Sequence, residues 1–229
     1  SEMDNVEASL KRCAGRFQAE GVDLDGYNIM EIVDDMEAAR VALGYERIDL
    51  LSQSFGSRVA MIYAWKHPDS LYRSALISVN PPGRLAWEPD VLDWQITYDA
   101  DLCARDTGCS ARTDDLAQTV RNVAHDMPRR WLFLPIDPGR VRFFTHFFLW
   151  YREGLTGRDA AMVYDTFLAA VKGDPSGLAV MSLMYDLIRP ATMMTWGQSG
   201  AIVMSTDFDS ARDYLSEMNP PGSILGAPQ

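Results

Sequence analysis

The stretch IDLLSQSFGSRVAMIYA, residues 48–64, most constrains what this chain can fold into. An apolar run begins at Ile48, and apolar residues recur at helical spacing after Gly56. The pattern predicts a buried strand over 48–51 and a helix over 55–66, joined by a tight turn. Ser54 is expected at the apex of that turn.

The turn has the form small-x-Ser-x-Gly, which is typical of a nucleophile elbow, although Ser52 stands where glycine is usual. Small residues are expected at Ser52 and Gly56 because the strand and helix backbones come close, so that a side chain there would collide. The bend would expose the Ser54 hydroxyl, and the following helix N-terminus favours developing negative charge. The alternative is a serine that merely caps the helix. These five residues alone leave both interpretations open.

Composition excludes several function classes. The 229 residues allow one large domain or two small ones, and 47% hydrophobic residues suffice for a core. The densest apolar run, residues 143–151, is about half the roughly 18 residues that a bilayer span needs. A net charge of −11 without a basic stripe argues against a nucleic-acid partner. We therefore expect neither nucleic acid nor a membrane as partner, and the sequence has no recognisable signal peptide.

Three cysteines are present, and two of them lie six positions apart in CARDTGC. This spacing suits a local disulfide between Cys103 and Cys109 in an oxidising compartment. Cys13 is left over, either as a buried thiol or as the partner of a cysteine outside this chain. No fourth ligand has the spacing of a zinc site, so neither a metal nor a cofactor is expected.

The first third of the chain alternates helices with strands. Apolar residues predict an amphipathic helix over 3–19, and Asn28 with Glu31 predicts the start of a second helix that stops at Gly44. A second buried strand is expected over 74–79. Helix, strand, helix and strand with short connections indicate a parallel α/β sheet.

After Gly83 the pattern becomes helical. Helices are predicted over 90–103, 113–126, 139–153, 157–172 and 176–188. Thr113 and Asp174 are the expected caps. Only Ala201–Ser205 is typical of a further strand, and the tail over 219–229 is expected to be irregular. The predicted organisation is a core part over 1–83, a helical cap over 84–200 and a return segment over 201–229.

An ordered string of short motifs runs from Cys13 to Gly83. Its members are GVDL at 21–24, DDMEA at 34–38, LGYERI at 43–48, SFGSR at 54–58, HPD at 67–69 and NPP at 80–82. The string resembles the secreted tripeptidyl aminopeptidase and prolyl aminopeptidase-like branch of the α/β hydrolases. This resemblance implies the α/β class and an α/β-hydrolase fold, here with an incomplete parallel sheet and a large inserted helical cap.

The resemblance also implies a chemistry. Ser54 would be the nucleophile that forms an acyl-enzyme, and the backbone N–H of Phe55 would donate to the oxyanion. The cap would cover Ser54 and shape the substrate pocket. Substrates in this family are peptides with free N-termini, or small esters and amides. A secreted or periplasmic location follows from the resemblance and from the cysteine pair.

The chain departs from the family pattern at the other triad members. Hydrolases of this type place the acid and then the histidine after the cap, and an oxyanion segment of the His-Gly-Gly type before the elbow. The three histidines, His67, His125 and His146, do not match these places. Asp207 follows a strand-like run as a triad acid would, but no histidine follows it. We expect further polypeptide to supply the remaining strands, the acid, the histidine and a partner for Cys13.

Three functions stay open at this stage. The first is an aminopeptidase-type serine peptidase, the second an esterase or amidase of the same fold, and the third a non-catalytic, hydrolase-like binding protein. Arg58 is expected to be solvated rather than paired with a carboxylate. The aromatic run over 143–151, with Trp131 and Trp196, would either line an apolar pocket or pack between helices.

Overall fold

The computed structural model describes residues 2–83, 89–150, 159–188 and 196–226. The chain forms two compact units, each built from two separate segments. The sheet unit contains residues Ser1–Ala86 and Ala191–Ser210, and the helical unit contains Trp87–Pro190 and Ala211–Gln229. The chain therefore passes from one unit to the other three times.

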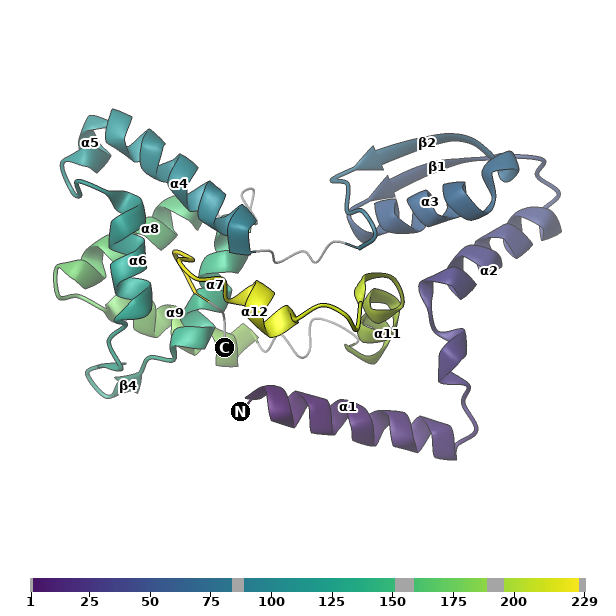
Figure 1. Ribbon diagram of the computed structural model, residues 1–229, viewed down its shortest axis with the longest axis horizontal. Helices are drawn as coiled ribbons and strands as arrows, with labels where there is room; N and C mark the ends of the chain where they lie inside the picture. The colour runs from purple at the N-terminus through teal and green to yellow at the C-terminus, as the bar shows by residue number, and fades with distance from the viewer. Residues whose placement is uncertain (1, 84–88, 151–158, 189–195, 227–229) are drawn as a thin grey trace. The chain divides into compact units, whose positions relative to one another are not determined.

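Up to residue 83 the sheet unit has the predicted order of helices and strands (Figure 1). It comprises α1 (Glu2–Ala19), η1 (Leu24–Gly26), α2 (Ile29–Ala42), β1 (Ile48–Gln53), α3 (Phe55–Lys66), η2 (Pro68–Ser70), β2 (Leu71–Ile77) and α11 (Trp196–Asp207). Asn28 caps α2 by accepting hydrogen bonds from the N–H groups of Met30 and Glu31. The helix before the first strand therefore begins where its sequence signal predicts.

Strands β1 and β2 pair in parallel, with Gln53 opposite Ile77 at their carboxyl ends. Figure 1 shows α3 running along one face of the pair. Along β1 half-buried and exposed residues alternate, so Leu50 packs toward the helices while Leu51 is 78% exposed. The prediction of buried strands is wrong in this respect. A sheet that is covered on one face buries only every second side chain.

The core of the sheet unit lies between α2, α3 and the covered sheet face. Ile29, Val33, Ile62 and Tyr63 are buried there. The Tyr63 hydroxyl donates to Glu37, which also accepts from Arg40 at 2.8 Å. Hydrogen bonds from Arg40 and Tyr63 lower the pKa of Glu37 to about 2. This polar group fixes α2 against α3 without leaving a buried charge uncompensated.

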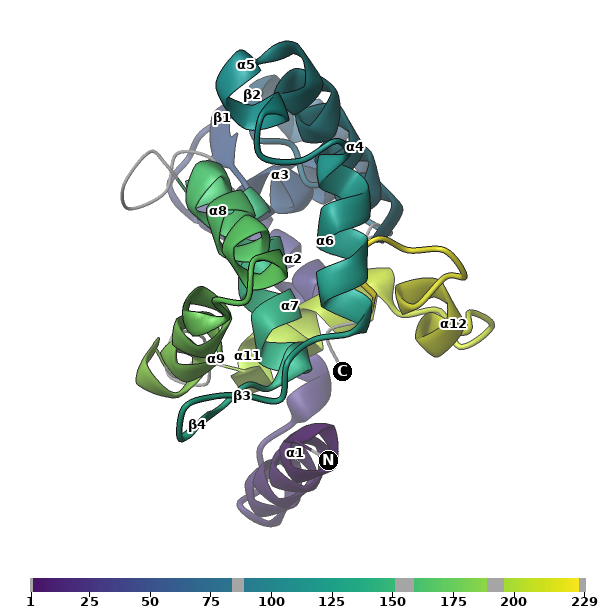
Figure 2. The same cartoon turned by 90° about the vertical axis from the view of Figure 1, so that its left-hand side faces the viewer.

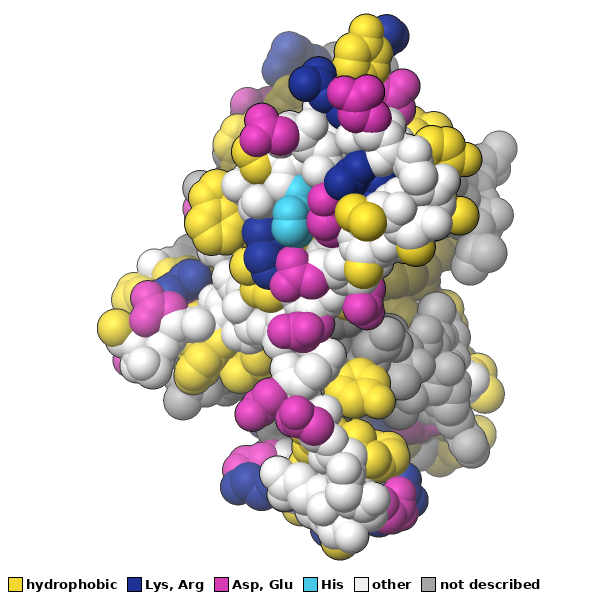
Figure 3. All heavy atoms as spheres, turned by 90° about the vertical axis from the view of Figure 1, so that its right-hand side faces the viewer, with side chains coloured by type: hydrophobic (Ala, Val, Ile, Leu, Met, Phe, Trp, Pro, Cys, Tyr) yellow, Lys and Arg dark blue, Asp and Glu magenta, His cyan; other side chains and the backbone are white. Residues whose placement is uncertain are grey.

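A second charged group lies at the C-terminal end of α3. Lys66 and His67 both contact Asp34 on α2, and the hydrogen bonds from Lys66 first and His67 second lower the pKa of Asp34. Figure 3 shows acidic and basic side chains next to a histidine on this side of the molecule. Lys66 and His67 thus share one acidic partner, Asp34.

The helical unit is almost entirely α-helical (Figure 2). It comprises α4 (Pro89–Arg105), α5 (Thr107–Ser110), α6 (Leu116–His125), β3 (Arg130–Trp131), β4 (Leu134–Pro135), α7 (Pro138–Trp150), α8 (Asp159–Val171), α9 (Ser176–Ile188) and α12 (Tyr214–Met218). Strands β3 and β4 form a small antiparallel hairpin that sequence patterns did not predict. The predicted helices are present, with small differences at some ends, and the predicted ends at 153 and 157 lie outside the described residues.

The aromatic residues of α7 pack inside the helical unit. Phe144 and Phe148 are buried, and their ring centroids lie 5.6 Å apart. Phe143 packs against Tyr185 of α9 in a T-shaped, edge-to-face arrangement, with ring centroids 5.6 Å apart. For these residues packing between helices is therefore confirmed. Tyr151 and the side chain of Trp196 lie outside the described residues.

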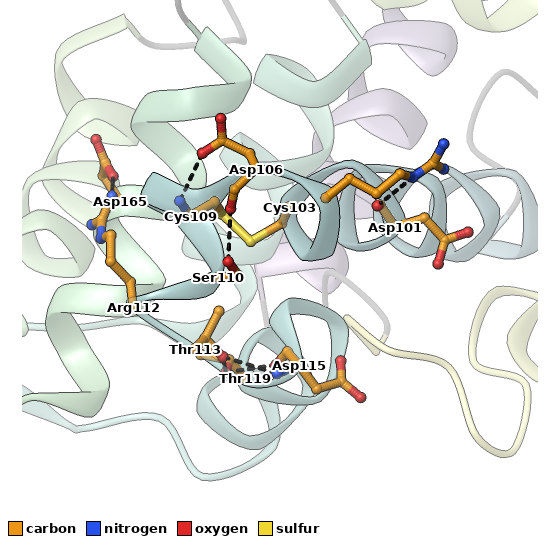
Figure 4. The surroundings of a disulfide bond; sticks show 11 residues. Asp101, Cys103, Asp106, Cys109, Ser110, Arg112, Thr113, Asp115, Thr119 and Asp165 are labelled. Atoms are coloured by element: carbon orange, nitrogen blue, oxygen red, sulfur yellow. Dashed lines mark hydrogen bonds and ion pairs between the residues drawn. A yellow bond between two sulfur atoms is a disulfide. The ribbon is translucent and has the colours of Figure 1, made fainter.

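The predicted disulfide between Cys103 and Cys109 is present, with Cα atoms 5.0 Å apart (Figure 4). It joins the last turn of α4 to α5, where the Asp106 side chain accepts from the Cys109 N–H at 2.8 Å. Cys13, on α1, is half-buried and is a free thiol in the described part of the chain. The bridge therefore belongs wholly to the helical unit.

Two local predictions are wrong. Ala201–Ser205 is not a strand, because these residues lie within α11. A run of four apolar residues does not distinguish a strand from a helix, and α11 packs against α2 of the same unit. Asp115 rather than Thr113 caps α6, by accepting from the Gln118 N–H at 2.9 Å. Asp174 accepts from the Ser176 N–H at the start of α9, as predicted.

The described residues after α12 are irregular, as expected, but residues 223–225 among them are buried in the helical unit. Ile224 and Leu225 belong to the core of that unit. The Ile224 N–H donates to the Asp93 carboxylate on α4 at 2.9 Å, and burial raises the pKa of Asp93. Residues 223–225 therefore complete a core whose other members precede residue 190.

Candidate active site

The turn between β1 and α3 has the geometry of a strained elbow. Ser54 is the single residue between the strand and the helix, with φ 53° and ψ −122°. Its N–H donates to the Ile77 carbonyl at the end of β2, at 3.0 Å. A residue other than glycine seldom adopts this backbone conformation, and such strain is concentrated at functional sites. The bend lies at the carboxyl edge of the sheet, where ligands of open α/β sheets bind.

Ser54 occupies the N-cap position of α3, but its side chain makes no capping hydrogen bond. Asn28 and Asp115 differ from Ser54 in this respect. Their backbones are extended, and their side chains accept hydrogen bonds from helix N–H groups. Ser54 is exposed. The interpretation of Ser54 as a capping residue is therefore wrong, and its hydroxyl remains accessible.

The small residues on either side of Ser54 meet as the motif predicts. A Cβ atom added to Gly56 would lie 3.6 Å from the Cβ of Ser52. This is an ordinary van der Waals distance, so a methyl group at Gly56 would fit and the expected collision applies only to larger side chains. Serine at position 52 is therefore compatible with the elbow.

The start of α3 provides donors beside Ser54. Phe55 is the first residue of the helix, and N–H groups in the first turn have no acceptor within their own helix. The aligned peptide dipoles add partial positive charge at this end. The Phe55 side chain packs against the core of the sheet unit, which fixes the position of its backbone N–H.

A second strained serine lies beside the first. Ser78 follows β2 as Ser54 follows β1, and it also has φ 53°. Because Gln53 pairs with Ile77, the two serines occupy neighbouring positions at the carboxyl edge. Ser78 is exposed. Sequence reasoning missed it, since no motif distinguishes it from other serines at strand ends.

The prediction that Arg58 is solvated is wrong. It is 2% exposed, and it forms an ion pair with Asp207, which is 5% exposed. It also donates to the Asn80 side-chain oxygen at 2.8 Å and to the Pro81 carbonyl at 3.1 Å. Arg58 is therefore a buried structural cation and not a solvated one. Asp207 is the counter-ion of Arg58, so its contacts are not those of a triad acid.

His67 lies far from Ser54. The two residues flank opposite ends of α3, and a helix of 12 residues is about 18 Å long. The His67 Nε2 atom is 3.1 Å from an Asp34 oxygen. The prediction that His67 is not catalytic is therefore consistent with its place in the fold.

The other two histidines belong to the helical unit. His125 ends α6, with Nε2 3.0 Å from the Ser223 carbonyl oxygen. His146 lies on α7, and burial lowers its pKa to about 4. Together with Arg142 it lines a cavity of about 20 Å³. That volume holds about one water molecule and is too small for a substrate.

Within the described ranges, no group of three or more histidine, cysteine, aspartate or glutamate residues is arranged to hold a metal ion. None of the helices in the described part of the chain combines the length and apolar composition that crossing a bilayer requires.

Comparison with known proteins agrees with the geometry. The family model described as alpha/beta hydrolase fold matches residues 9–141, which include β1, the elbow, β2 and the first helices of the helical unit. Comparisons with curated proteins and with solved structures found no match. The matched range is more than half of the chain, and it contains Ser54 and Phe55.

Proposed function

We propose that this chain, which belongs to the α/β-hydrolase fold family, acts as a serine hydrolase with Ser54 as its nucleophile. The observation that carries the proposal is the conformation of Ser54. The residue is strained and exposed, its side chain makes no capping bond, and it stands at a helix N-terminus. A strained nucleophile at this place in the fold is what the elbow motif provides.

In the proposed reaction the Ser54 oxygen attacks the carbonyl carbon of the substrate. A histidine takes the Ser54 proton as general base, and the Phe55 N–H donates to the oxyanion of the tetrahedral intermediate. One such donor contributes about 3–4 kcal/mol of transition-state stabilisation. The leaving amine or alcohol departs with the proton from the histidine. Water then hydrolyses the acyl-enzyme and restores Ser54.

The histidine and its acid are proposed to come from further polypeptide. His67 and Asp207 are engaged elsewhere, with Asp34 and Arg58 respectively. The sheet face that carries Leu51 and Ile77 supports this proposal, because both side chains are exposed in the part of the chain that the structure describes. Parallel sheets are normally covered on both faces, and further strands with their helices would cover this one.

For the substrate we propose a peptide with a free N-terminus, as an aminopeptidase-type enzyme would take. The support is the motif string over residues 13–83, which resembles the tripeptidyl and prolyl aminopeptidase-like branch. Small esters and amides are the alternative substrates of the same chemistry. The remaining alternative is a hydrolase-like protein that binds a ligand without turnover.

A secreted or periplasmic location is proposed on the same resemblance. The Cys103–Cys109 disulfide is compatible with it, because such bonds persist in oxidising compartments. Reducing compartments keep most protein thiols free, so the redox state of this pair in cell extracts tests the location directly.

The test of the chemistry is covalent labelling. The full gene product is treated with a fluorophosphonate, and the modified peptide is identified by mass spectrometry. Labelling at Ser54 that disappears in Ser54→Ala, and persists in Ser78→Ala as the neighbouring-serine control, supports the proposal. A folded gene product that is never labelled supports the binding protein instead. Aminoacyl anilides with free and acetylated N-termini, compared with nitrophenyl esters, then separate peptidase from esterase.

A further inference from the structure

A buried hydroxyl lies directly behind the candidate nucleophile. The Ser57 side chain, which is fully buried, donates to the Ser54 carbonyl oxygen at 2.6 Å. The same oxygen of Ser57 accepts from the Asn80 N–H at 2.8 Å. The Ser57 N–H also donates to the Ser54 carbonyl, at 2.9 Å. Ser57 therefore joins the backbone of the elbow to the loop that follows β2.

Arg58 holds the same loop from its other side. One terminal nitrogen of its guanidinium donates both to the Asn80 side-chain oxygen and to the Pro81 carbonyl. The other terminal nitrogen contacts Asp207 and, at 3.3 Å, the Thr206 hydroxyl. A planar guanidinium with several donors suits this role, because it can bind several acceptors at fixed angles.

Asp207 closes the arrangement. It is the last residue of α11, and its second carboxylate oxygen accepts from the Gly83 N–H at 2.9 Å. The loop over 80–83 is therefore fastened at its start by Ser57 and Arg58 and at its end by Asp207. All of these contacts lie within the sheet unit.

We infer that the Arg58–Asp207 ion pair is a positioning device for Ser54, acting through Asn80 and Ser57. A strained backbone persists only where its surroundings over-determine it. The Ser57 hydroxyl donates to the Ser54 carbonyl oxygen and thereby fixes the orientation of the peptide group that follows the strained residue. The inference rests on the proposed function, and it adds that α11, although it follows the cap in sequence, sets the reactivity of the elbow.

The experiment measures the rate of fluorophosphonate labelling of Ser54 in the full gene product. Asp207→Asn removes the charge opposite Arg58, and it is expected to slow labelling at least tenfold at temperatures where the variant is still folded. Asp165→Asn is the matched control, because it breaks an exposed ion pair with Arg112 in the helical unit. The control is expected to be labelled at the wild-type rate.

Two further variants separate positioning from stability. Ser57→Ala keeps the ion pair and removes only the bridging hydroxyl, so it should slow labelling at temperatures where it is folded, with a smaller drop in unfolding temperature than Asp207→Asn. Arg58→Met with Asp207→Leu removes both buried charges, so it should also be destabilised less than Asp207→Asn and still be labelled slowly. Hydrogen exchange of the Asn80 amide, which donates to Ser57, should be faster in all three variants.

The outcomes distinguish the two proposals. If the wild type is labelled and Ser57→Ala and the double variant react at its rate, the positioning role is overturned while the serine-hydrolase proposal stands. If labelling in every variant follows thermal stability alone, the ion pair is merely structural. If the wild type itself is never labelled, both proposals are overturned.

Discussion

Arg58 and Asp207 form a buried ion pair although 149 positions separate them in the chain. One residue belongs to the first turn of α3 and the other ends α11. Both side chains are almost fully removed from water, so each charge depends on the other for compensation. The pair therefore ties the segment that follows the predicted cap to the turn that carries Ser54.

Replacement of Asp207 by asparagine should lower the free energy of unfolding by about 3–5 kcal/mol, because a buried cation loses its counter-ion. Denaturant unfolding followed by circular dichroism measures the change. The control is Asp165→Asn, whose side chain is 59% exposed and whose ion pair should contribute no more than about 1 kcal/mol. Equal losses in the two variants would contradict the buried character of the pair.

Replacement of Ser54 by glycine should stabilise the protein by about 1–2 kcal/mol, because glycine adopts a positive φ without steric cost. Ser54→Ala retains the Cβ atom and should show little of this gain. Thermal unfolding of the two variants side by side gives the comparison. If alanine and glycine stabilise equally, the strain does not lie in the backbone of Ser54.

The elbow could be predicted from the sequence because its signals are local. The helix from Phe55 to Lys66 was predicted with its observed bounds, and the asparagine cap at Asn28 is confirmed. Each of these features depends on residues within one or two turns. The conformation of Ser54 follows from the same short motif, since the small residues on both sides permit the bend.

The stability of the helical unit should fall as the pH is lowered from about 6.5 to about 4. Burial lowers the pKa of His146 to about 4, so the folded state binds this proton less readily than the unfolded state, whose histidine titrates near 6.5. The full effect is about 3 kcal/mol and is complete once the pH is below 4.

Unfolding measured at pH 7.0, 6.0, 5.0 and 4.0 tests this expectation. His146→Leu should remove the loss between pH 6.5 and 4.5, and His125→Gln should retain it. The sheet unit should lose stability at lower pH, because the pKa of Glu37 is about 2, below its ordinary value of 4.5, and its contribution is lost as the pH falls between these values. A variant at His146 with an unchanged profile would contradict the assignment.

Reduction of the Cys103–Cys109 disulfide should destabilise the helical unit by about 2 kcal/mol, because the bridge closes a short loop. Replacing both cysteines by serine should give the same loss without reductant. Thermal unfolding with and without dithiothreitol shows the effect. The Cys13→Ser variant serves as the control, since Cys13 is a free thiol outside this unit.

A lysine at Leu51 should leave the free energy of unfolding of this chain within about 0.5 kcal/mol of wild type, because Leu51 lies on the uncovered sheet face. A lysine at Leu50, which packs against the core of the sheet unit, should cost more than about 2 kcal/mol. If further polypeptide covers the sheet, Leu51→Lys should become costly in the full gene product. An equal, small effect in both proteins would argue against such a cover.

Long-range partners explain what the sequence did not reveal. Nothing near Arg58 indicates that its counter-ion lies 149 positions away, so solvation was the simpler expectation. The same applies to Ala201–Ser205, whose apolar residues suit a strand until α2 is known to lie beside them. Ser57 was visible in the motif, but its role depends on where Asn80 lies.

The burial of residues 223–225 among helices that begin near residue 89 also concerns biosynthesis. Asp93 accepts a hydrogen bond from the Ile224 N–H, but it leaves the ribosome 131 positions earlier. The core of the helical unit is therefore complete only after Ile224 and Leu225 have emerged from the ribosome. A nascent chain stalled before these residues would expose that core to chaperones and proteases.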